Sequence, residues 1–366
     1  MFSDTAYKNA DACRFCWMCR HLCPIALKTG KEIDSARAKG LMVSMVKRGE
    51  EYDPSMAEVM WECCLCGACA NDCATGYDPR IYIREARSIA LAEGIAPAGV
   101  SALADRMLES GCMFEEKAVD AALERRISAL PEQAELLLLL GQVAKYKVPQ
   151  LAEAAMELLD KAGINYTVLR DEPDSGAYLG DMIGFVDEVK TAACALNRAI
   201  VSSGAKTVVV LDPFDARIIK HEYAQWNCAV NAQVHTATAY FAELVRKGTL
   251  ICSKLGGLGS IHDAGALSRD LDETEPVRTL AAAVGLEVVE LLRHGALAKS
   301  CGGALLMQYA PALSRSVAQG RWEDVLRTGS RLLVTEAPGS YYALAQCVPD
   351  SCQLTDILLL LAKACR

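Results

Sequence analysis

The chain has few aromatic residues, few histidines and no long apolar run. Phe, Trp and Tyr make up 6% of its 366 residues, and its five histidines form no cluster. Two apolar runs, Leu136–Leu140 and Ile357–Leu361, are five residues each, whereas a membrane-spanning helix needs about twenty. We therefore expect no membrane span, and we interpret the first run as a buried strand and the second as one face of a C-terminal helix.

An excess of basic residues is also missing, and no leader sequence is visible. The formal net charge of −8 argues against binding to nucleic acid or to an anionic membrane surface, because both depend on clustered Lys and Arg. Residues 1–4 are not a basic region that leads into an apolar stretch. We therefore expect no signal peptide.

The common catalytic signatures are absent as well. The sequence has neither a Walker motif nor a G-x-S-x-G elbow. The glycine-rich segment 255–260 lacks the G-x-G-x-x-G order, and no phosphate-binding lysine follows it. We predict a flexible loop there, and no catalytic residue in this chain.

Cysteine, by contrast, is abundant, and eight of the seventeen cysteines form two runs of equal spacing. The runs are Cys13, Cys16, Cys19 and Cys23, followed by Pro24, and then Cys63, Cys66, Cys69 and Cys73. Each reads C-x2-C-x2-C-x3-C, a spacing in which three thiolates bind one [4Fe–4S] cluster and the fourth binds the neighbouring cluster. The sequence therefore predicts two [4Fe–4S] clusters and one-electron chemistry.

Crossed ligation assigns the eight cysteines to two sets. Cys13, Cys16, Cys19 and Cys73 are predicted to hold the first cluster, and Cys63, Cys66, Cys69 and Cys23 the second. Cys64 is interpreted as a packed thiol. A disulfide framework is disfavoured by the odd number of cysteines. Structural zinc is the other alternative. It is disfavoured because zinc sites usually take two C-x2-C or H-x3-H pairs separated by a loop. Because the clusters are sensitive to oxygen, we expect a reducing cytoplasm.

The first 95 residues are predicted to form an α-helical ferredoxin domain. Residues 33–47 have helical spacing, and Asp78 and Pro79 are an N-cap and first-turn proline that open a second helix, which ends near Gly94. No alternating strand pattern occurs around the cysteine runs. Residues 96–131 are predicted to be a helical connection, with helices at 101–109 and 115–130.

Beyond residue 131, short apolar strands alternate with helices. Strands are predicted at 136–140, 164–169 and 207–211, and helices at 149–162 and 180–203. This order predicts an α/β layer with a mostly parallel sheet. Residues 203–210 recur as residues 328–335 at an offset of 125, and Pro213 falls on Pro338. We predict an α+β multidomain chain in which a duplicated α/β domain occupies residues 132–250 and 251–366.

These features together resemble a family of iron–sulfur subunits. Its members combine two ferredoxin-type runs with two α/β repeats that carry a Cys-Cys-Gly (CCG) site and a Cys-Pro site. The family includes the iron–sulfur subunits of anaerobic glycerol-3-phosphate dehydrogenase and of glycolate and lactate oxidation systems, and the heterodisulfide reductase D subunit. Residues 260–263, 276–278, 285–290 and 234–236 resemble its Tyr-His-Asp-Pro-Cys, Pro-Arg, Gly-hydrophobic-Glu and histidine-led turn segments.

Most cysteines of the family's two repeats are missing from this chain. In the first repeat the five positions are filled by Gln142, Asp174, Ser175, Asp212 and Asp215. In the second, Gly265, Ser300, Ala337 and Ser340 fill four positions and Cys301 fills the fifth. One thiol cannot hold a cluster, so the resemblance implies CCG-like repeats that bind none.

Two functional interpretations of these altered positions are less favoured than structural ones. The aspartates of the first repeat offer a hard cation oxygen ligands, but N-caps and solvated carboxylates are more common at strand ends. Cys301 is interpreted as a buried leftover cysteine in preference to a reactive thiol near a helix start.

The resemblance implies an electron-transfer subunit of a multi-subunit, FAD-dependent dehydrogenase. FAD would lie on a partner subunit, and electrons would pass singly through both clusters to a quinone system, a ferredoxin or an electron-transfer flavoprotein. Arg14, Trp17, Arg20 and His21, beside the first run, are candidates for tuning a cluster or facing a partner. The alternatives are a heterodisulfide-type thiol/disulfide catalyst, which would need the missing cysteines, and a structural subunit with non-redox clusters.

Overall fold

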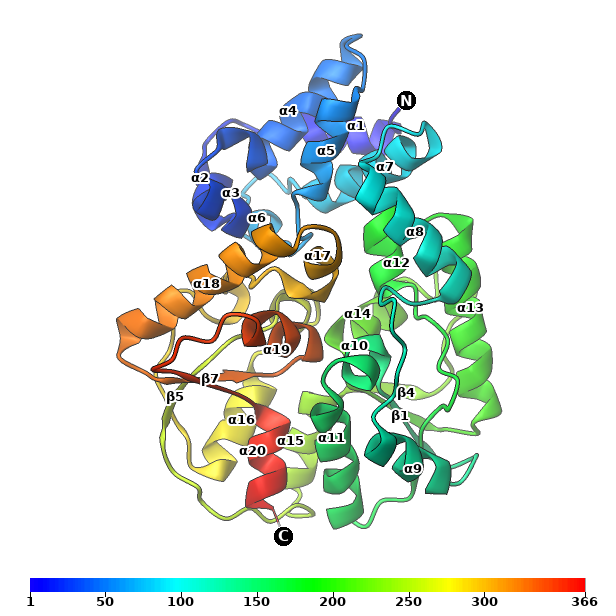
Figure 1. Ribbon diagram of the computed structural model, residues 1–366, viewed down its shortest axis with the longest axis vertical. Helices are drawn as coiled ribbons and strands as arrows, with labels where there is room; N and C mark the ends of the chain where they lie inside the picture. The colour runs from blue at the N-terminus through cyan, green and yellow to red at the C-terminus, as the bar shows by residue number, and fades with distance from the viewer. Residues whose placement is uncertain (366) are drawn as a thin grey trace.

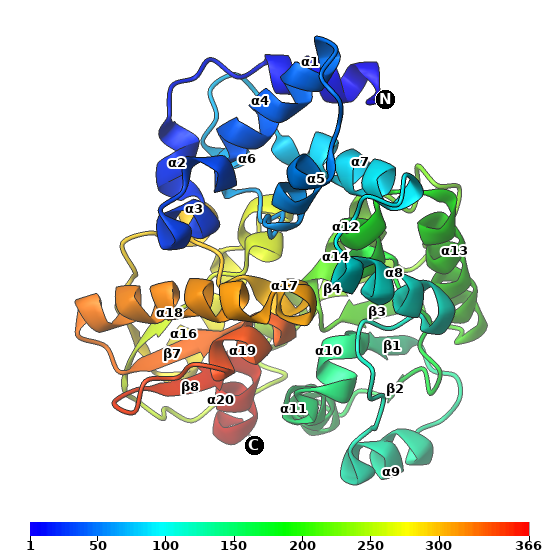
Figure 2. The ribbon, with the colours of Figure 1, turned by 45° about the horizontal axis from the view of Figure 1, so that its top comes forward.

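Two parallel sheets lie side by side beneath a cap of N-terminal helices in the computed structural model, which describes residues 1–365 (Figures 1 and 2). The cap spans both sheets, and it consists of α1 (Asp4–Asp11), α2 (Met18–Leu22), α3 (Pro24–Thr29), η1 (Glu32–Asp34), α4 (Ala36–Lys47), α5 (Pro54–Trp61), α6 (Ala68–Asn71) and α7 (Pro79–Ala92). No strand occurs in it, so the prediction of a helical N-terminal region is confirmed.

Side-chain caps explain where the helices of this region begin. Asp78 caps α7 by accepting a hydrogen bond from the backbone N–H of Arg80, and Pro79 occupies the first turn, as predicted. The next helices are α8 (Ala98–Ser110) and α9 (Ala121–Ala129). The prediction of a helix over 115–130 is wrong in its first part, because Asp120 accepts from the backbone N–H of Ala122 and Leu123 and so starts the helix there.

The first sheet has the order β2-β1-β3-β4, with all strands parallel. Its elements are β1 (Leu136–Leu139), α10 (Gly141–Tyr146), α11 (Pro149–Lys161), β2 (Tyr166–Thr167), α12 (Ala177–Ile183), α13 (Asp187–Ser202), β3 (Thr207–Val210), α14 (Pro213–His221), β4 (Gln233–Thr236) and α15 (Ala237–Arg246). The buried strand predicted at 136–140 is confirmed.

The second sheet has the same order, β6-β5-β7-β8, and is also parallel. Its elements are β5 (Leu258–Ile261), η2 (Ala266–Asp270, a π-helical turn), α16 (Glu275–Val284), β6 (Glu287–Val288), η3 (Gly295–Leu297), α17 (Gly303–Tyr309), α18 (Pro311–Thr328), β7 (Leu332–Thr335), α19 (Pro338–Ala345), β8 (Gln353–Asp356) and α20 (Ile357–Ala364). β3 and β7 are the strands related by the sequence offset of 125.

The loop predicted at 255–260 is only partly correct. Leu258–Ile261 form β5, which pairs with β6 on one side and β7 on the other. Pairing on both sides of this central strand overrides the local glycine content, so the loop is confined to the residues before it.

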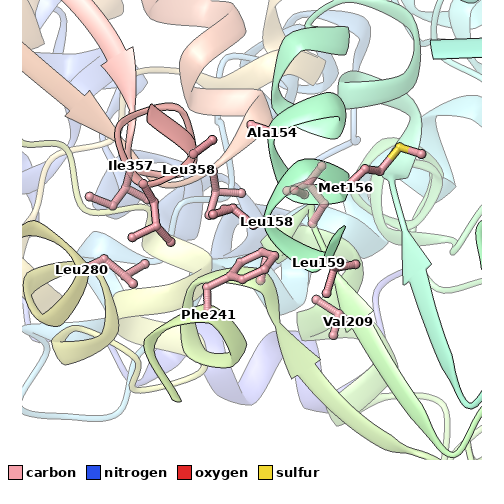
Figure 3. Packing of buried hydrophobic residues seen from close by; sticks show 14 of the residues in the cluster. Ala154, Met156, Leu158, Leu159, Val209, Phe241, Leu280, Ile357 and Leu358 are labelled. Carbon is pink, nitrogen blue, oxygen red and sulfur yellow. The ribbon is translucent and has the colours of Figure 1, made fainter. Parts of the chain in front are cut away.

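Between the sheets, helices from both predicted repeats share one apolar core. Leu158 of α11, Phe241 of α15, Leu280 of α16 and Ile357 of α20 are all fully buried in this core, and Figure 3 shows them converging. Two of these helices, α11 and α15, flank the first sheet, and the other two, α16 and α20, flank the second. The core between the sheets is therefore built jointly by both halves. None of the helices within residues 1–365 combines the length and the apolar character needed to cross a bilayer.

The long helix predicted at 180–203 is instead two helices, α12 and α13, separated at Gly184. Gly184 has a φ of +81° and a ψ of 176°, a conformation almost restricted to glycine. A Cβ atom at this position would lie 2.8 Å from the backbone oxygen of Arg84 in α7. The turn therefore brings the first repeat into close contact with the N-terminal region.

We expect Gly184→Ala to lower the free energy of unfolding by about 3 kcal/mol, because alanine would add backbone strain and a steric clash. Gly204→Ala is the matched control: Gly204 has a φ of +72° with no atom within 4 Å of an added Cβ, so strain alone should cost about 1 kcal/mol. Chemical denaturation measures both. Equal losses would mean that the contact with α7 contributes nothing.

Candidate metal centre

Both cysteine runs begin in loops of the same backbone shape. Left-handed φ values occur at equivalent positions, namely 54° at Phe15 and 68° at Trp17 in the first run and 48° at Leu65 and 71° at Gly67 in the second. The backbone N–H of Phe15 lies 3.5 Å from Cys13 Sγ, and that of Leu65 lies 3.3 Å from Cys63 Sγ. Hydrogen bonds of this kind to ligand sulfurs are a feature of iron–sulfur sites.

The first predicted set of cysteines surrounds one cavity. Cys13, Cys16, Cys19 and Cys73 all line a cavity of about 260 Å³, and Cys69 of the second set also reaches its wall. Burial raises the pKa of the Cys19 thiol, and Cys13, Cys16 and Cys73 contribute to the rise as like-charged neighbours. The fold thus brings Cys73 of the second run to the three leading cysteines of the first.

The second predicted set is gathered in the same way. Burial raises the pKa of Cys23 to about 12, and its like-charged neighbours are Cys63 and Cys66. Burial likewise raises the pKa of Cys69 well above its ordinary value, and the like-charged neighbours Cys66, Cys63, Cys23 and Cys19 contribute to the rise. Cys23 of the first run therefore lies among the three leading cysteines of the second.

The donor chemistry of both sets suits iron–sulfur clusters. Four closely grouped thiolates would repel one another in these partly buried positions, and bound iron would neutralise them. The cavity of the first set is several times the roughly 30 Å³ that a water molecule occupies, which leaves room for a polynuclear group.

Comparisons with known proteins also indicate iron–sulfur clusters in this chain. Residues 9–77 match the family described as the 4Fe-4S dicluster domain. The chain is 24% identical over 383 residues to the D subunit of the dihydromethanophenazine:CoB–CoM heterodisulfide reductase of Methanosarcina acetivorans, covering 97% of this chain and 93% of that protein. This is an iron–sulfur protein whose sequence is similar to that of the heterodisulfide reductase D subunit.

Two further similarities extend over most of the iron–sulfur protein. It is 25% identical over 407 residues to a "probable membrane-anchored ferredoxin" of Chromohalobacter salexigens, covering 97% of this chain but only 59% of that longer protein. A crystal structure of a hypothetical protein from Helicobacter pylori aligns with a TM-score of 0.54 and 12% identity, covering 89% of this chain and 67% of that one. The second similarity concerns the fold alone.

Cationic side chains from three parts of the iron–sulfur protein surround the second set. Arg87 of α7 donates to the backbone oxygen of Cys63 at 2.5 Å. Arg269 of η2 donates to the backbone oxygen of Cys66 at 3.0 Å and to that of Ala298 at 2.7 Å. Lys39 is buried in α4, and its charge counteracts the rise in the pKa of Cys63. The second set thus lies where the N-terminal region meets the second repeat.

Cys64 contacts this site without belonging to the predicted second set. A hydrogen bond with the Cys64 thiol, together with the charges of Arg269 and Arg80, lowers the pKa of Cys66 to about 6. On its other side, Cys64 Sγ lies 3.8 Å from Ser300 Oγ of the second repeat. The packing role predicted for Cys64 therefore includes a polar contact with a ligand candidate.

The first set, by contrast, lies close to solvent. Trp17 is 47% exposed, and the neighbouring Phe15 and Met18 are exposed to a similar degree. The Arg37 guanidinium lies 3.6 Å from the centroid of the Trp17 ring, which holds the indole in place. Among the other candidates, Arg14 donates to the Asp11 backbone oxygen, Arg20 pairs with Glu32, and His21 is exposed.

The altered positions of the first repeat converge at the carboxyl ends of its strands. Ser175 Oγ donates to Asp215 Oδ1 at 2.5 Å, and Tyr178 donates to Asp212 Oδ2 at 2.8 Å. Gln142 accepts from the backbone N–H of Met113. Within residues 1–365, no three His, Cys, Asp or Glu side chains lie close enough to share a single metal ion; the two cysteine sets would instead bind clusters of several irons.

One altered position of the second repeat keeps a cysteine, Cys301, and its environment disfavours the thiolate. Cys301 is buried, and burial raises the pKa of its thiol. Because the thiolate is the nucleophile, this environment favours the structural interpretation of Cys301.

Sequence spacing did not reveal two further contacts between thiols. Cys252 and Cys365 face each other across an antiparallel bridge, and their hydrogen bond contributes to raising the pKa of Cys365 to about 12. Cys194 and Cys228 make a similar hydrogen bond. Neither pair has a signature in sequence, because its members come together only through packing.

Proposed function

We propose that this iron–sulfur protein is the electron-transfer subunit of a multi-subunit dehydrogenase. Two clusters would supply one-electron transfer, with Cys13, Cys16, Cys19 and Cys73 as ligands of the first and Cys63, Cys66, Cys69 and Cys23 as ligands of the second. The convergence of cysteines from both runs in each set is the observation that carries this proposal. The related reductase subunits and the 4Fe-4S dicluster domain support it.

The two sets differ in a way that suits a relay. The exposed first set would face a redox partner, since electron transfer requires the two centres to come close together. The second set is enclosed by Arg87, Arg269 and Lys39, which would hold it rigidly and favour its more negatively charged, reduced state. Residues 1–95 would then form the electron-carrying domain, with 96–131 as its connection.

The CCG-like repeats, 132–250 and 251–366, would serve as a scaffold that bears no cluster. Their identical strand order supports the duplication, and the buried thiol of Cys301 disfavours thiol/disulfide catalysis. We propose a partner subunit that binds FAD and an acceptor that is a quinone system, a ferredoxin or an electron-transfer flavoprotein. The complex would work in the cytoplasm or at the membrane surface through a partner.

Anaerobic affinity purification from the native cell tests this function. We expect a dehydrogenase subunit containing FAD to be recovered in stoichiometric amount, and its substrate to reduce the clusters. Recovery of the chain alone would contradict the proposal. Clusters that no physiological donor reduces would instead favour a structural role.

Arg269→Gln tests the influence of the second repeat on the second cluster. Loss of this cation is expected to lower the reduction potential of that cluster by on the order of 50 mV, because the positive charge favours the reduced state. A redox titration followed by electron paramagnetic resonance measures the shift. The control is Arg125→Gln, which removes an exposed arginine of α9 and should leave both potentials unchanged. A shift confined to the first cluster would refute the influence of Arg269 on the second cluster.

A further inference from the structure

A cavity of about 440 Å³ opens at the carboxyl edge of the first sheet. Its wall includes Gly141, which follows β1, Glu172 and Asp174 from the segment after β2, and Asp215 at the start of α14 after β3. Ligands of parallel α/β sheets characteristically bind beyond the carboxyl ends of the strands. The volume is also typical of small-molecule sites.

Two carboxylate groups in this wall each have an oxygen without a hydrogen-bond donor. Asp215 is only 6% exposed. Its Oδ1 accepts a hydrogen bond from Ser175, while its Oδ2 has no hydrogen-bond partner within residues 1–365. This Oδ2 lies over Gly141, 2.7 Å from the position that a Cβ atom on Gly141 would take. Asp174 Oδ1 accepts from the backbone N–H of Gly176, but its Oδ2 is buried and accepts no hydrogen bond in this part of the chain.

An unsatisfied buried carboxyl oxygen such as Asp174 Oδ2 is unusual, because burial without a partner is costly. Burial raises the pKa of Asp174 to about 6. Burial, together with the nearby Asp212, raises the pKa of Asp215 well above its ordinary value. A positive charge placed between Asp174 and Asp215 would offset these costs.

The chain's own cations do not supply that charge. Lys145 lines the cavity but donates to the backbone oxygen of Arg170 at 2.7 Å. Lys117, also in the wall, donates to the backbone oxygen of Ser110 at 2.6 Å. Among residues 1–365, neither lysine forms an ion pair with Asp174 or Asp215. The charge would therefore come from a ligand.

The geometry favours an organic cation over a metal ion. No three acidic, histidine or cysteine side chains in the described part of the chain are arranged to share an ion, and the cavity is many times larger than one ion needs. We propose that this cavity binds a small organic ammonium compound, with its –NH3+ group between Asp174 and Asp215. This site goes beyond electron transfer and does not depend on it.

Isothermal titration calorimetry of the anaerobic, cluster-loaded protein with putrescine tests the proposal, with butanediol as its neutral analogue. We expect saturable binding of putrescine and none of butanediol. Asp215→Asn retains an acceptor for Ser175 but lacks the charge, so it should weaken putrescine binding about tenfold or more. Asp187→Asn, which removes an exposed carboxylate from α13, should leave the affinity unchanged.

Asp174→Asn is the second variant and is also expected to weaken binding by about tenfold. Both variants should keep the cluster absorbance and the melting temperature, so that loss of binding cannot be attributed to unfolding. Absence of saturable putrescine binding, equal binding to Asp215→Asn, or displacement of putrescine by stoichiometric Mg²⁺ would each overturn the proposal. Loss of cluster function without loss of binding would contradict only the electron-transfer role.

Discussion

Serine in place of Cys73 is expected to leave about four iron atoms per chain where the intact protein holds about eight. The cluster lost should be the one gathered around Cys13, Cys16 and Cys19, although Cys73 belongs to the other run, because the fold places Cys73 at their cavity. Iron analysis of protein reconstituted under anaerobic conditions measures this loss.

Two double variants distinguish crossed from local ligation. Under crossed ligation, Cys16→Ser with Cys73→Ser damages a single cluster and leaves about four iron atoms, whereas Cys66→Ser with Cys73→Ser damages both and leaves almost none. Local ligation within each run predicts the reverse pair of results. Either reversal would therefore refute the proposed ligand sets.

Cys64→Ser is the matched control for these variants. Cys64 lies in the same loop as Cys63 and Cys66 but contacts Cys66 and Ser300 without belonging to either set. Serine can replace both contacts, so the variant should retain about eight iron atoms. Loss of iron from Cys64→Ser would identify it as a ligand.

Arg87→Leu is expected to lower the free energy of unfolding by about 4 kcal/mol or more, the largest effect we expect on stability. Arg87 is 1% exposed and donates to the backbone oxygens of Met60, Cys63 and Asp181. Hydrogen bonds from a charged donor contribute about 1.5–3 kcal/mol each, and leucine would leave three acceptors without a partner. Chemical denaturation under anaerobic conditions measures the loss.

As denaturant is added, the Arg87→Leu variant should also lose its second cluster at a lower concentration than its first. Arg87 anchors the loop that carries Cys63, whereas none of its hydrogen bonds within residues 1–365 goes to a cysteine of the first set. The control, Arg106→Leu, breaks an ion pair with the exposed Glu115 and one hydrogen bond to the backbone oxygen of Met113, which together should cost about 2 kcal/mol or less. Equal destabilisation in the two variants, or parallel loss of both clusters, would contradict the role assigned to Arg87.

Local patterns predicted the helical N-terminal region and the parallel strands well. Asp78 and Pro79 begin α7 as expected, and the apolar run after residue 135 is β1. The errors occurred where a distant segment overrides the local pattern. Gly184 divides a continuous helical pattern because α7 packs against it, and β5 forms within a glycine-rich segment because strands lie on both sides of it.

The cavity in the first repeat shows a different limit of sequence reasoning. The altered positions Asp174, Ser175 and Asp215 could be named from the sequence, but their surroundings could not. Whether a carboxylate is solvated, capped or unsatisfied depends on neighbours brought in by other loops. The buried, unpaired Oδ2 of Asp174 and the hydrogen bond between Ser175 and Asp215 are therefore visible only in the folded chain.

The sequence by itself determined the number and spacing of the cysteine runs and the order of strands and helices. These features depend on short stretches of chain, in which ligand reach and hydrophobic periodicity operate directly. Tertiary structure decided which cysteines share a site, which cations surround it and where carboxylates remain unpaired. Arg269 and Cys66 are 203 residues apart, and only packing of the second repeat against the N-terminal helices brings two such residues into contact.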